Sequence, residues 1–386
     1  MISNRINKIM GVQMGAIENR VGELRKKLQN EKIDTFLVLI EENRRYLSGF
    51  TGEDAQFDES AGALLITSDS LVLATDSRFE TQAGRESPGY EVVTYKKGLV
   101  KALPGMLKSM KTRRLGFESR RMSYEMYSNI LQAIEESGLS VELVPTLEMV
   151  ESLRLIKDED EIRALCEAVG VAEAAFKNFL ETLEPGIFET DAAWTLERRM
   201  REGGAQSLSF PVIAASGPNS ALPHAIPERR AFRESEPLLF DWGAKLNGYC
   251  SDMTRMVFLK DPDEAFKRIF NTVYEAQQKA IDAIRPGMTT RQVDAVARSH
   301  IEKNGYKGYF GHGLGHGVGL AVHEAPSLSP TPQRERTIAE NMVFTVEPGI
   351  YIPDKGGVRL ENMVVVRGNG AEPLNRLEIR MDMISS

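Results

Sequence analysis

The stretch LLFDWGAKLNGYCSDMTRMVFL, residues 238–259, decides the fold of the second half of the chain. Two apolar segments flank Asn247 and Gly248, and this dipeptide is preferred in two-residue hairpin turns. A turn at that place makes Leu246 the direct partner of Tyr249. The stretch therefore predicts an antiparallel β-hairpin.

Two aspartates become neighbours in this hairpin. In the predicted register, Asp241 and Asp252 are diagonal neighbours on one face of the sheet. Asp241 follows the apolar run of residues 238–240, which is typical of an interior strand rather than of a solvated face. Two like charges so close inside a protein are costly unless a cation lies between them. The hairpin therefore indicates a metal site.

A second pair of acids lies in residues 344–366. Glu347 ends one apolar run, residues 353–357 form a turn, and Glu361 lies in the next run. This pattern predicts another hairpin. Its register stays open, because residues 348–349, Pro-Gly, can introduce a bulge. The two glutamates share a face in one register and not in another.

Histidines and glycines lie between these two hairpins. The segment 311–319 alternates glycine with other residues, and it lacks the spacing of a dinucleotide fingerprint. The histidines outside predicted helices are His224, His312, His316 and His323. Each one taken alone is more often structural than a ligand. Together with four acids, they offer the imidazoles and bridging carboxylates that two adjacent divalent ions need.

The order of these residues resembles the ligand set of a known family. Asp241, Asp252, His316, Glu347 and Glu361 are similar to the five metal ligands of the pita-bread metallopeptidases, which include methionine aminopeptidase, aminopeptidase P and prolidase. Further segments carry the resemblance to the histidine-bearing parts of that family, namely residues 216–220 (SGPNS) with 223–224 (PH) and residues 322–326 (VHEAP).

The N-terminal half narrows the resemblance to one branch. Residues 45–50 (RYLSGF) and 76–78 (DSR) are similar to the creatinase-type domain of prolidase and aminopeptidase P. Two positions depart from the pattern: Ala321 stands where an acid is frequent, and Asn362 stands where Asp often follows the last ligand. These departures concern substrate preference and the surroundings of the ligands more than catalysis.

Two domains are expected from charge, periodicity and resemblance. Residues 14–150 are predicted to form the creatinase-type α/β domain, with strands near 35–40, 63–66, 71–74, 91–95, 114–117 and 141–144. Residues 151–386 are predicted to form an α+β pita-bread catalytic domain with a curved antiparallel sheet. The Pro-Gly pairs 185–186 and 286–287 and the glycines 204 and 305 recur at one offset, which predicts an internal pseudo-repeat.

The resemblance implies a dinuclear metallopeptidase that hydrolyses the Xaa-Pro bond of short proline-containing peptides. Asp252 and Glu361 would bridge two ions, Asp241 would bind one, and His316 with Glu347 would bind the other. A metal-bridging hydroxide would be the nucleophile. A set rich in oxygen ligands favours Mn²⁺, with Co²⁺ and Fe²⁺ as alternatives.

Other residues receive roles in the same scheme. Glu347 is the candidate proton shuttle. His323 and His224 are candidate catalytic residues that would hold the substrate and the tetrahedral oxyanion. Arg359 has two open roles, binding of a substrate carboxylate or pairing with a nearby acid. Cys250 has the opposite strand parity to Asp252, so it is expected to pack in the interior.

Composition limits the partners and the location. The 386 residues contain 48 Lys and Arg against 55 Asp and Glu, so a net charge of −7 gives no general attraction to nucleic acid or anionic membranes. Only Cys166 and Cys250 are present, which excludes a disulfide framework. No segment reaches membrane-spanning length. The sequence predicts a cytoplasmic protein without nucleic-acid or membrane partners, and the resemblance implies a homodimer.

Three alternatives stay open. A metal-free, creatinase-like hydrolase would not keep the ligand set, and a non-catalytic binding protein of the same fold would have lost ligands or histidines. This chain retains all of them. The choice between dipeptidase and aminopeptidase depends on loops at the far side of the proline pocket, which one sequence does not position.

Overall fold

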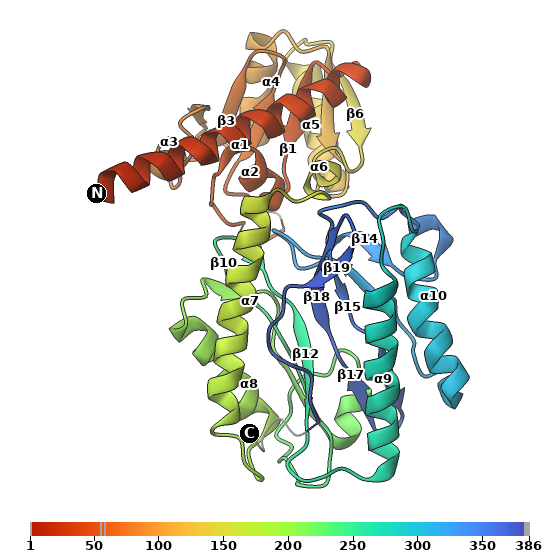
Figure 1. Cartoon of the computed structure of the whole chain (residues 1–386). Helices are drawn as coiled ribbons and strands as arrows, with labels where there is room; N and C mark the ends of the chain where they lie inside the picture. Colours follow the sequence, from red (N-terminus) through yellow and green to blue (C-terminus); the bar gives the residue numbers. More distant parts are fainter. Residues whose placement is uncertain (1, 55, 58, 382–386) are drawn as a thin grey trace. The chain divides into compact units, whose positions relative to one another are not determined.

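The computed structural model describes residues 2–54, 56–57 and 59–381, with side chains from residue 15 onward. The chain forms two compact units, Met1–Arg154 and Leu155–Ser386 (Figure 1). The first is an α/β unit, and the second combines helices with antiparallel sheets. The predicted two-domain architecture is therefore confirmed.

The first unit is built around one mixed sheet. Its strands run in the order β4-β3-β2-β1-β5-β6, where β1 is antiparallel to β2 and parallel to β5. The strands are β1 (Thr35–Val38), β2 (Ala63–Ile66), β3 (Leu71–Thr75), β4 (Glu91–Thr94), β5 (Arg114–Glu118) and β6 (Glu142–Thr146). The helices are α1 (Ile2–Asn30), α2 (Glu41–Ser48), α3 (Glu80–Glu86), α4 (Leu99–Ser109), α5 (Tyr124–Glu136) and α6 (Glu151–Arg154). The strands predicted from short apolar runs are confirmed.

A buried carboxyl group joins two elements of this unit. Glu118, at the end of β5, is only 4% exposed and accepts hydrogen bonds from the backbone N–H groups of Leu39 and Ile40, at 2.6 Å each. It also accepts a hydrogen bond from the Asn43 side chain. Burial raises the pKa of Glu118 from 4.5 to about 7 despite these donors. The carboxyl group ties the start of α2 to the sheet.

The raised pKa of Glu118 makes stability depend on pH. Between pH 4.5 and 7 the folded state holds the proton that the unfolded state has lost, so the free energy of unfolding falls as pH rises, by roughly 3 kcal/mol in total. Urea denaturation at pH 5 and pH 8 measures this change. In Glu118→Gln we expect that part of the pH dependence to vanish; an unchanged slope would contradict the assignment.

The second unit contains two helix pairs and several antiparallel sheets. The helices are α7 (Glu159–Leu180), α8 (Glu189–Glu202), α9 (Glu264–Ala283) and α10 (Thr290–Ile301), with shorter turns at Gly217–Ala221, Glu302–Tyr306 and Pro332–Arg334. The strands are β7 (Ser207–Leu208), β8 (Ile213–Ser216), β9 (Leu238–Trp242), β10 (Ala244–Leu246), β11 (Tyr249–Cys250), β12 (Met253–Val257), β13 (Gly315–Gly317), β14 (Glu324–Leu328), β15 (Val343–Val346), β16 (Gly349–Ile352), β17 (Gly356–Arg359), β18 (Asn362–Arg367) and β19 (Gly370–Pro373).

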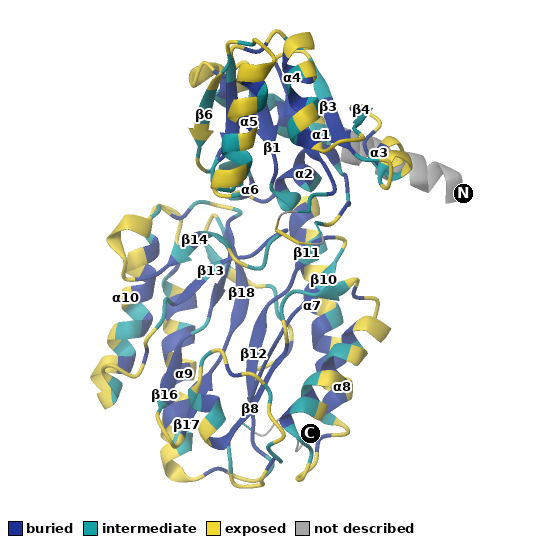
Figure 2. Ribbon diagram, turned by 180° about the vertical axis from the view of Figure 1, so that it is seen from behind, coloured by how far each residue is buried: buried dark blue, intermediate teal, exposed yellow. Residues whose placement is uncertain are grey.

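These strands assemble into sheets that the sequence only outlined. The sheet orders are β12-β9-β8, β11-β10-β7, β14-β13-β15-β18-β19 and β16-β17. Figure 2 shows the strands as dark, buried ribbon, while the outer faces of the helices are exposed. Among the described residues, no helix is long and apolar enough to cross a membrane.

The first hairpin has the predicted register. Leu246 pairs with Tyr249, and Thr254 pairs with Asp241. Asn247 and Gly248 have φ angles of 50° and 80°, as the preferred two-residue turn requires. The hairpin is interrupted between β9 and β10 and between β11 and β12, and Asp252 lies at the second interruption.

The second hairpin settles the register that the sequence left open. Val346 pairs with Asn362 before the interruption, and Gly349 pairs with Arg359 beyond it. The register is the same on both sides, so the Pro-Gly pair introduces no slip. Glu347 and Glu361 therefore occupy opposing positions, and each lies where its strand pair is interrupted.

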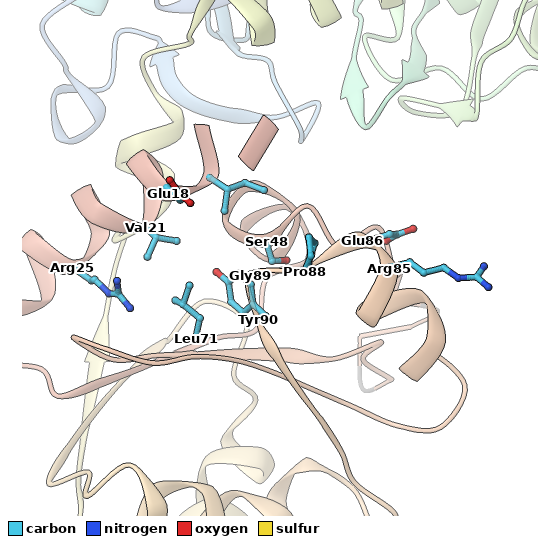
Figure 3. A pocket seen from close by; sticks show the side chains of 11 residues that line it. Glu18, Val21, Arg25, Ser48, Leu71, Arg85, Glu86, Pro88, Gly89 and Tyr90 are labelled. Atoms are coloured by element: carbon cyan, nitrogen blue, oxygen red, sulfur yellow. The ribbon is translucent and has the colours of Figure 1, made fainter. Parts of the chain in front are cut away.

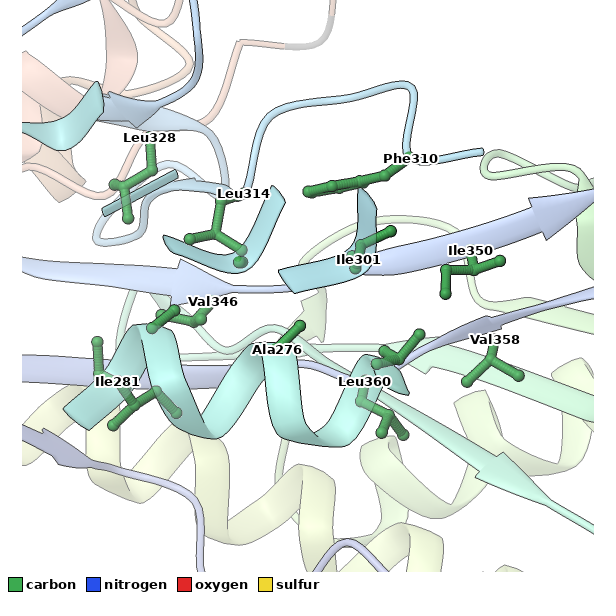
Figure 4. Close-up of a cluster of buried hydrophobic side chains, with 14 of the residues drawn as sticks. Ala276, Ile281, Ile301, Phe310, Leu314, Leu328, Val346, Ile350, Val358 and Leu360 are labelled. Atoms are coloured by element: carbon green, nitrogen blue, oxygen red, sulfur yellow. The ribbon is translucent and has the colours of Figure 1, made fainter. Parts of the chain in front are cut away.

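Each helix pair covers a different part of the sheets. Around α7 and α8, the ring of Phe176 stacks on Trp242 with centroids 4.1 Å apart. Around α9 and α10, Ala276 and Ile281 face strand residues such as Val346 (Figure 4). Both hairpins contribute side chains to both hydrophobic clusters, so the clusters pack the two hairpins together.

The interruption beside Asp252 requires a residue without a Cβ atom at position 243. A Cβ atom on Gly243 would overlap the carbonyl oxygen of Ser251, so we expect Gly243→Ala to lower the free energy of unfolding by roughly 1–3 kcal/mol. Gly170 in α7 has open space around it, and Gly170→Ala should raise that energy by roughly 0.5–1 kcal/mol. Urea denaturation compares the two. If both substitutions changed the free energy of unfolding equally, the close approach of Gly243 to the Ser251 carbonyl oxygen would be unimportant for stability.

Candidate metal centre

Four acidic side chains and one histidine come together on the second unit. Asp241 lies near the end of the interior strand β9. Asp252 and Glu361 directly precede strands, and Glu347 directly follows one. Asp252 and Glu361 are 4% and 1% exposed, although neither carries an apolar side chain. His316 lies on β13, which pairs with β15 beside Glu347. The structure thus brings together all five residues that the resemblance marked as ligands.

The imidazole of His316 faces the acids with one nitrogen. Its Nε2 lies 3.6 Å from Asp252 Oδ2 and 3.4 Å from Glu347 Oε1. Its Nδ1 donates to the Gly317 carbonyl oxygen at 3.2 Å, which leaves Nε2 as the free lone pair. One ligand atom each of Asp252, His316 and Glu361 lies within 4.8 Å of the other two. This spacing suits a shared cation.

Asp241 has one oxygen bound and one oxygen free. Arg359 donates to its Oδ2 at 2.6 Å, whereas Oδ1 is buried and has no hydrogen-bond partner among the described residues. An unpartnered buried carboxylate oxygen is costly unless a cation or water occupies its lone pairs. The Oδ1 atom therefore supports a cation on this side of the cluster.

Arg359 shows one of the two roles that the sequence left open. Besides Asp241, its guanidinium binds the Tyr351 hydroxyl at 3.0 Å, the Pro223 carbonyl oxygen and the Thr254 hydroxyl. It is only 2% exposed. Arg359 therefore pairs with a nearby acid and joins the two hairpins, and its contact with a substrate stays a prediction.

The pKa values show how unfavourable the cluster is without a cation. Burial raises the pKa of Asp241, and it raises the pKa of Glu347 to about 8. Burial, together with the other acids, raises the pKa values of Asp252 and Glu361 well above their usual range. Burial also lowers the pKa of His316 to about 3, which keeps the imidazole in the neutral form that binds metals. The donor set fits divalent cations.

The other histidines line the surroundings of this cluster. The ring of His323 lies 4.2 Å from that of His316 between centroids. His312 forms a 2.8 Å hydrogen bond with the Tyr351 hydroxyl. His224 is exposed on the loop after the Gly217–Ala221 turn, and in its protonated form it lowers the pKa values of Asp241 and His323. His300 lies on α10 beside Glu275, away from these groups, as expected.

Reasoning from sequence missed the residues that hold the ligands. Thr254 and Thr345 donate to Glu361 and Glu347, at 2.7 and 3.2 Å. Arg255 is fully buried and donates to the Glu361 carbonyl oxygen. Strand parity could have found Thr254, which pairs with Asp241, and an arginine inside an apolar run was a signal for Arg255.

A helix clamp holds the glycine-rich segment before His316. Asp294, on α10, accepts from the Leu314 N–H and from Arg298. Arg298 in turn donates to the carbonyl oxygens of Phe310 and His312, at 2.9 and 2.7 Å. A segment with alternating glycines has little conformational preference of its own. The clamp supplies the order that this composition lacks.

The first unit has a separate pocket of about 210 Å³ between α1 and the loop before β4 (Figure 3). Two of its polar side chains are engaged elsewhere: Arg25 donates to the Thr67 carbonyl oxygen, and Tyr90 donates to that of Leu47. This pocket offers no ligand set like that of the acidic cluster.

Two family models match the chain. Metallopeptidase family M24 matches residues 163–368, and the creatinase/prolidase N-terminal domain matches residues 20–156. The chain therefore belongs to metallopeptidase family M24 and carries a creatinase-type domain before the peptidase domain. The resemblance drawn from the ligand motifs is confirmed.

Individual relatives extend over nearly the whole chain. The uncharacterized peptidase YqhT of Bacillus subtilis is 41% identical over 91% of this chain and 96% of its own length. The Xaa-Pro dipeptidase from Bacillus anthracis is 38% identical, with a TM-score of 0.87 over 95% of this chain and 99% of that one. The X-Pro aminopeptidase from Thermotoga maritima is 35% identical, with a TM-score of 0.82 over 91% and 97%.

Metal binding should stabilise the protein. We expect saturating Mn²⁺, at about 100 times its dissociation constant, to stabilise metal-stripped protein by ~2.7 kcal/mol and to raise its unfolding temperature. Asp252→Asn removes a candidate ligand and should abolish most of this shift. Glu372→Gln, at an exposed position of β19, should retain it. Thermal unfolding and titration calorimetry check both. A full shift in Asp252→Asn would contradict the assignment of this ligand.

Proposed function

We propose that this protein is a dinuclear metallopeptidase that hydrolyses the Xaa-Pro bond of short peptides. The observation that carries the proposal is the convergence of three carboxyl groups, those of Asp252, Glu347 and Glu361, around the neutral imidazole of His316. The buried Oδ1 atom of Asp241, which has no hydrogen-bond partner among the described residues, adds a fourth carboxyl group to this site. The names of the solved relatives, an Xaa-Pro dipeptidase and an X-Pro aminopeptidase, supply the substrate class.

The five converging residues are the proposed ligands. Asp252 and Glu361 would bridge two ions, Asp241 would bind one ion, and His316 with Glu347 would bind the other. Two bound divalent ions would polarise the scissile carbonyl and lower the pKa of a water molecule. The set of four carboxylates and one imidazole favours Mn²⁺, with Co²⁺ and Fe²⁺ as alternatives.

The remaining steps fall to the protein's own side chains. Glu347 is the proposed proton shuttle, which would take the proton of the attacking water and pass it to the leaving proline nitrogen. His323 and His224 carry hydrogen-bond donors for the substrate carbonyl and the developing oxyanion. Arg359 already neutralises Asp241, so a substrate carboxylate would share its remaining donor capacity.

We infer an internal pseudo-repeat in the catalytic domain, for which the backbone gives support. The same hydrogen-bond pattern opens α8 and α10. The first set is Gly186 N–H to Phe232, Phe232 N–H to Ile187 and Glu189 N–H to Arg230; the second is Gly287 N–H to Ile338, Ile338 N–H to Met288 and Thr290 N–H to Arg336. Both glycines have positive φ, 94° and 91°.

The domain bounds 14–150 and 151–386 belong to the same proposal.

Several further properties that go with this function stay predictions. These are the choice between dipeptidase and aminopeptidase, the homodimer, the cytoplasmic location and the absence of nucleic-acid partners. The alternatives of a metal-free hydrolase and a non-catalytic binding protein are disfavoured by the buried, unpartnered oxygen of Asp241. Neither alternative needs a cation there.

The deciding experiment compares two substrates. Metal-stripped protein reloaded with Mn²⁺ is assayed on an Xaa-Pro dipeptide and on the same dipeptide extended by one residue. We expect cleavage of at least one, and a loss of at least a hundredfold in kcat/KM for Asp252→Asn, because an active-site ligand is removed. Cleavage of the dipeptide alone identifies a prolidase, and cleavage of the longer peptide identifies an aminopeptidase P. No cleavage of either peptide by metal-loaded protein would refute the proposed function.

A further inference from the structure

A glutamate outside the metal cluster is buried without a catalytic explanation. Glu189 is the first residue of α8, and its exposed fraction is 0%. Acids in the first turn of a helix are normally solvated, and a fully buried carboxylate needs several donors to compensate for its desolvation. The donors that Glu189 receives show what it does.

The carboxylate of Glu189 binds both ends of one loop. Its Oε1 accepts from the N–H and the hydroxyl group of Ser216, at 2.7 Å each. Its Oε2 accepts from the Glu228 N–H at 3.0 Å, and the Asn219 amide donates to both oxygens, at 3.2 and 3.1 Å. Residues 216 and 228 are the ends of the loop that carries His224.

The same loop reaches the metal cluster at its centre. The Ser220 hydroxyl accepts from the Gly357 N–H at 2.8 Å, and Arg359 donates to the Pro223 carbonyl oxygen at 3.1 Å. His224 follows Pro223 directly in the chain, and in its protonated form it lowers the pKa values of Asp241 and His323. The loop is thus fixed at its ends by Glu189 and at its middle by the strand that holds Arg359.

We propose that Glu189 is a positioning residue that holds His224 in place for the substrate. This rests on the proposed function, because it takes His224 as a substrate-binding group. Glu189 touches no proposed metal ligand in the contacts of the described residues, so its effect should appear in peptide binding and turnover and leave metal affinity unchanged. A glutamate that only stabilises the helix start would not act through His224.

The test is a double-mutant cycle on the metal-loaded full chain. In Glu189→Gln an amide N–H₂ faces N–H donors that a carboxylate accepted, so we expect kcat/KM to fall by about tenfold to a hundredfold. In the His224→Ala background, the same substitution should change kcat/KM by less than about twofold, because the group it positions is absent. Asp191→Asn, an exposed acid in the same helical turn, is the matched control and should have no effect.

Two further readouts separate positioning from simple stability. Mn²⁺ affinity, measured by calorimetry, should be the same in Glu189→Gln and in the parent protein. The side-chain NMR signals of His224, assigned by their loss in His224→Ala, should shift in Glu189→Gln and not in Asp191→Asn. If Glu189→Gln fails to fold, Asn219→Ala, which removes one of the same contacts, enters the cycle in its place.

The outcomes are distinct. Additive effects of the two substitutions, or unchanged His224 signals, would overturn the positioning role. A parent protein that cleaves neither test peptide refutes the proposed function instead, and the NMR comparison then still decides whether Glu189 positions His224.

Discussion

The burial of four carboxyl groups close together is the constraint on which the catalytic unit depends. Burial raises the pKa of Glu347 to about 8 and keeps the pKa values of Asp252 and Glu361 well above their usual range. Such a cluster destabilises a fold that has no cation for it. Three of the acids lie at interruptions of the two hairpins, whereas Asp241 lies within β9. Thr254 donates a hydrogen bond to Glu361, and Arg359 donates one to Asp241.

Both helix pairs have two structural roles in the second unit. Each pair covers a hydrophobic face of the sheets, and each also holds an irregular segment that carries histidines. On α10, Asp294 and Arg298 hold the glycine-rich segment before His316. On α8, Glu189 holds the loop that carries His224. Irregular segments have few ladder bonds of their own, so a rigid helix must supply their order.

Local patterns in the sequence predicted what local physics determines. Asn247 and Gly248 require a particular turn, and that turn alone fixes the register that places Asp241. The register opposite Glu347 was not predictable, because proline followed by glycine can shift a strand pair or leave it unchanged. The contacts of Glu189 were not predictable either, since its partners lie far along the chain and only folding brings them together.

Asn362 is a neutral residue beside the acidic cluster, and it affects how the charge of Arg255 is compensated. Arg255, fully buried behind the cluster, donates to the Asn362 side chain at 2.9 Å and to the carbonyl oxygens of Glu361 and Leu377. These acceptors are neutral, and the acidic groups that act on the guanidinium charge are Glu173 and Glu361. Burial lowers the pKa of Arg255 to about 10, which leaves it cationic at neutral pH. Its field therefore acts on the nearby Glu361, where it favours the ionised carboxylate and opposes an approaching cation. The departure at Asn362 thus bears on how tightly metal is held, whereas the ligands themselves are retained.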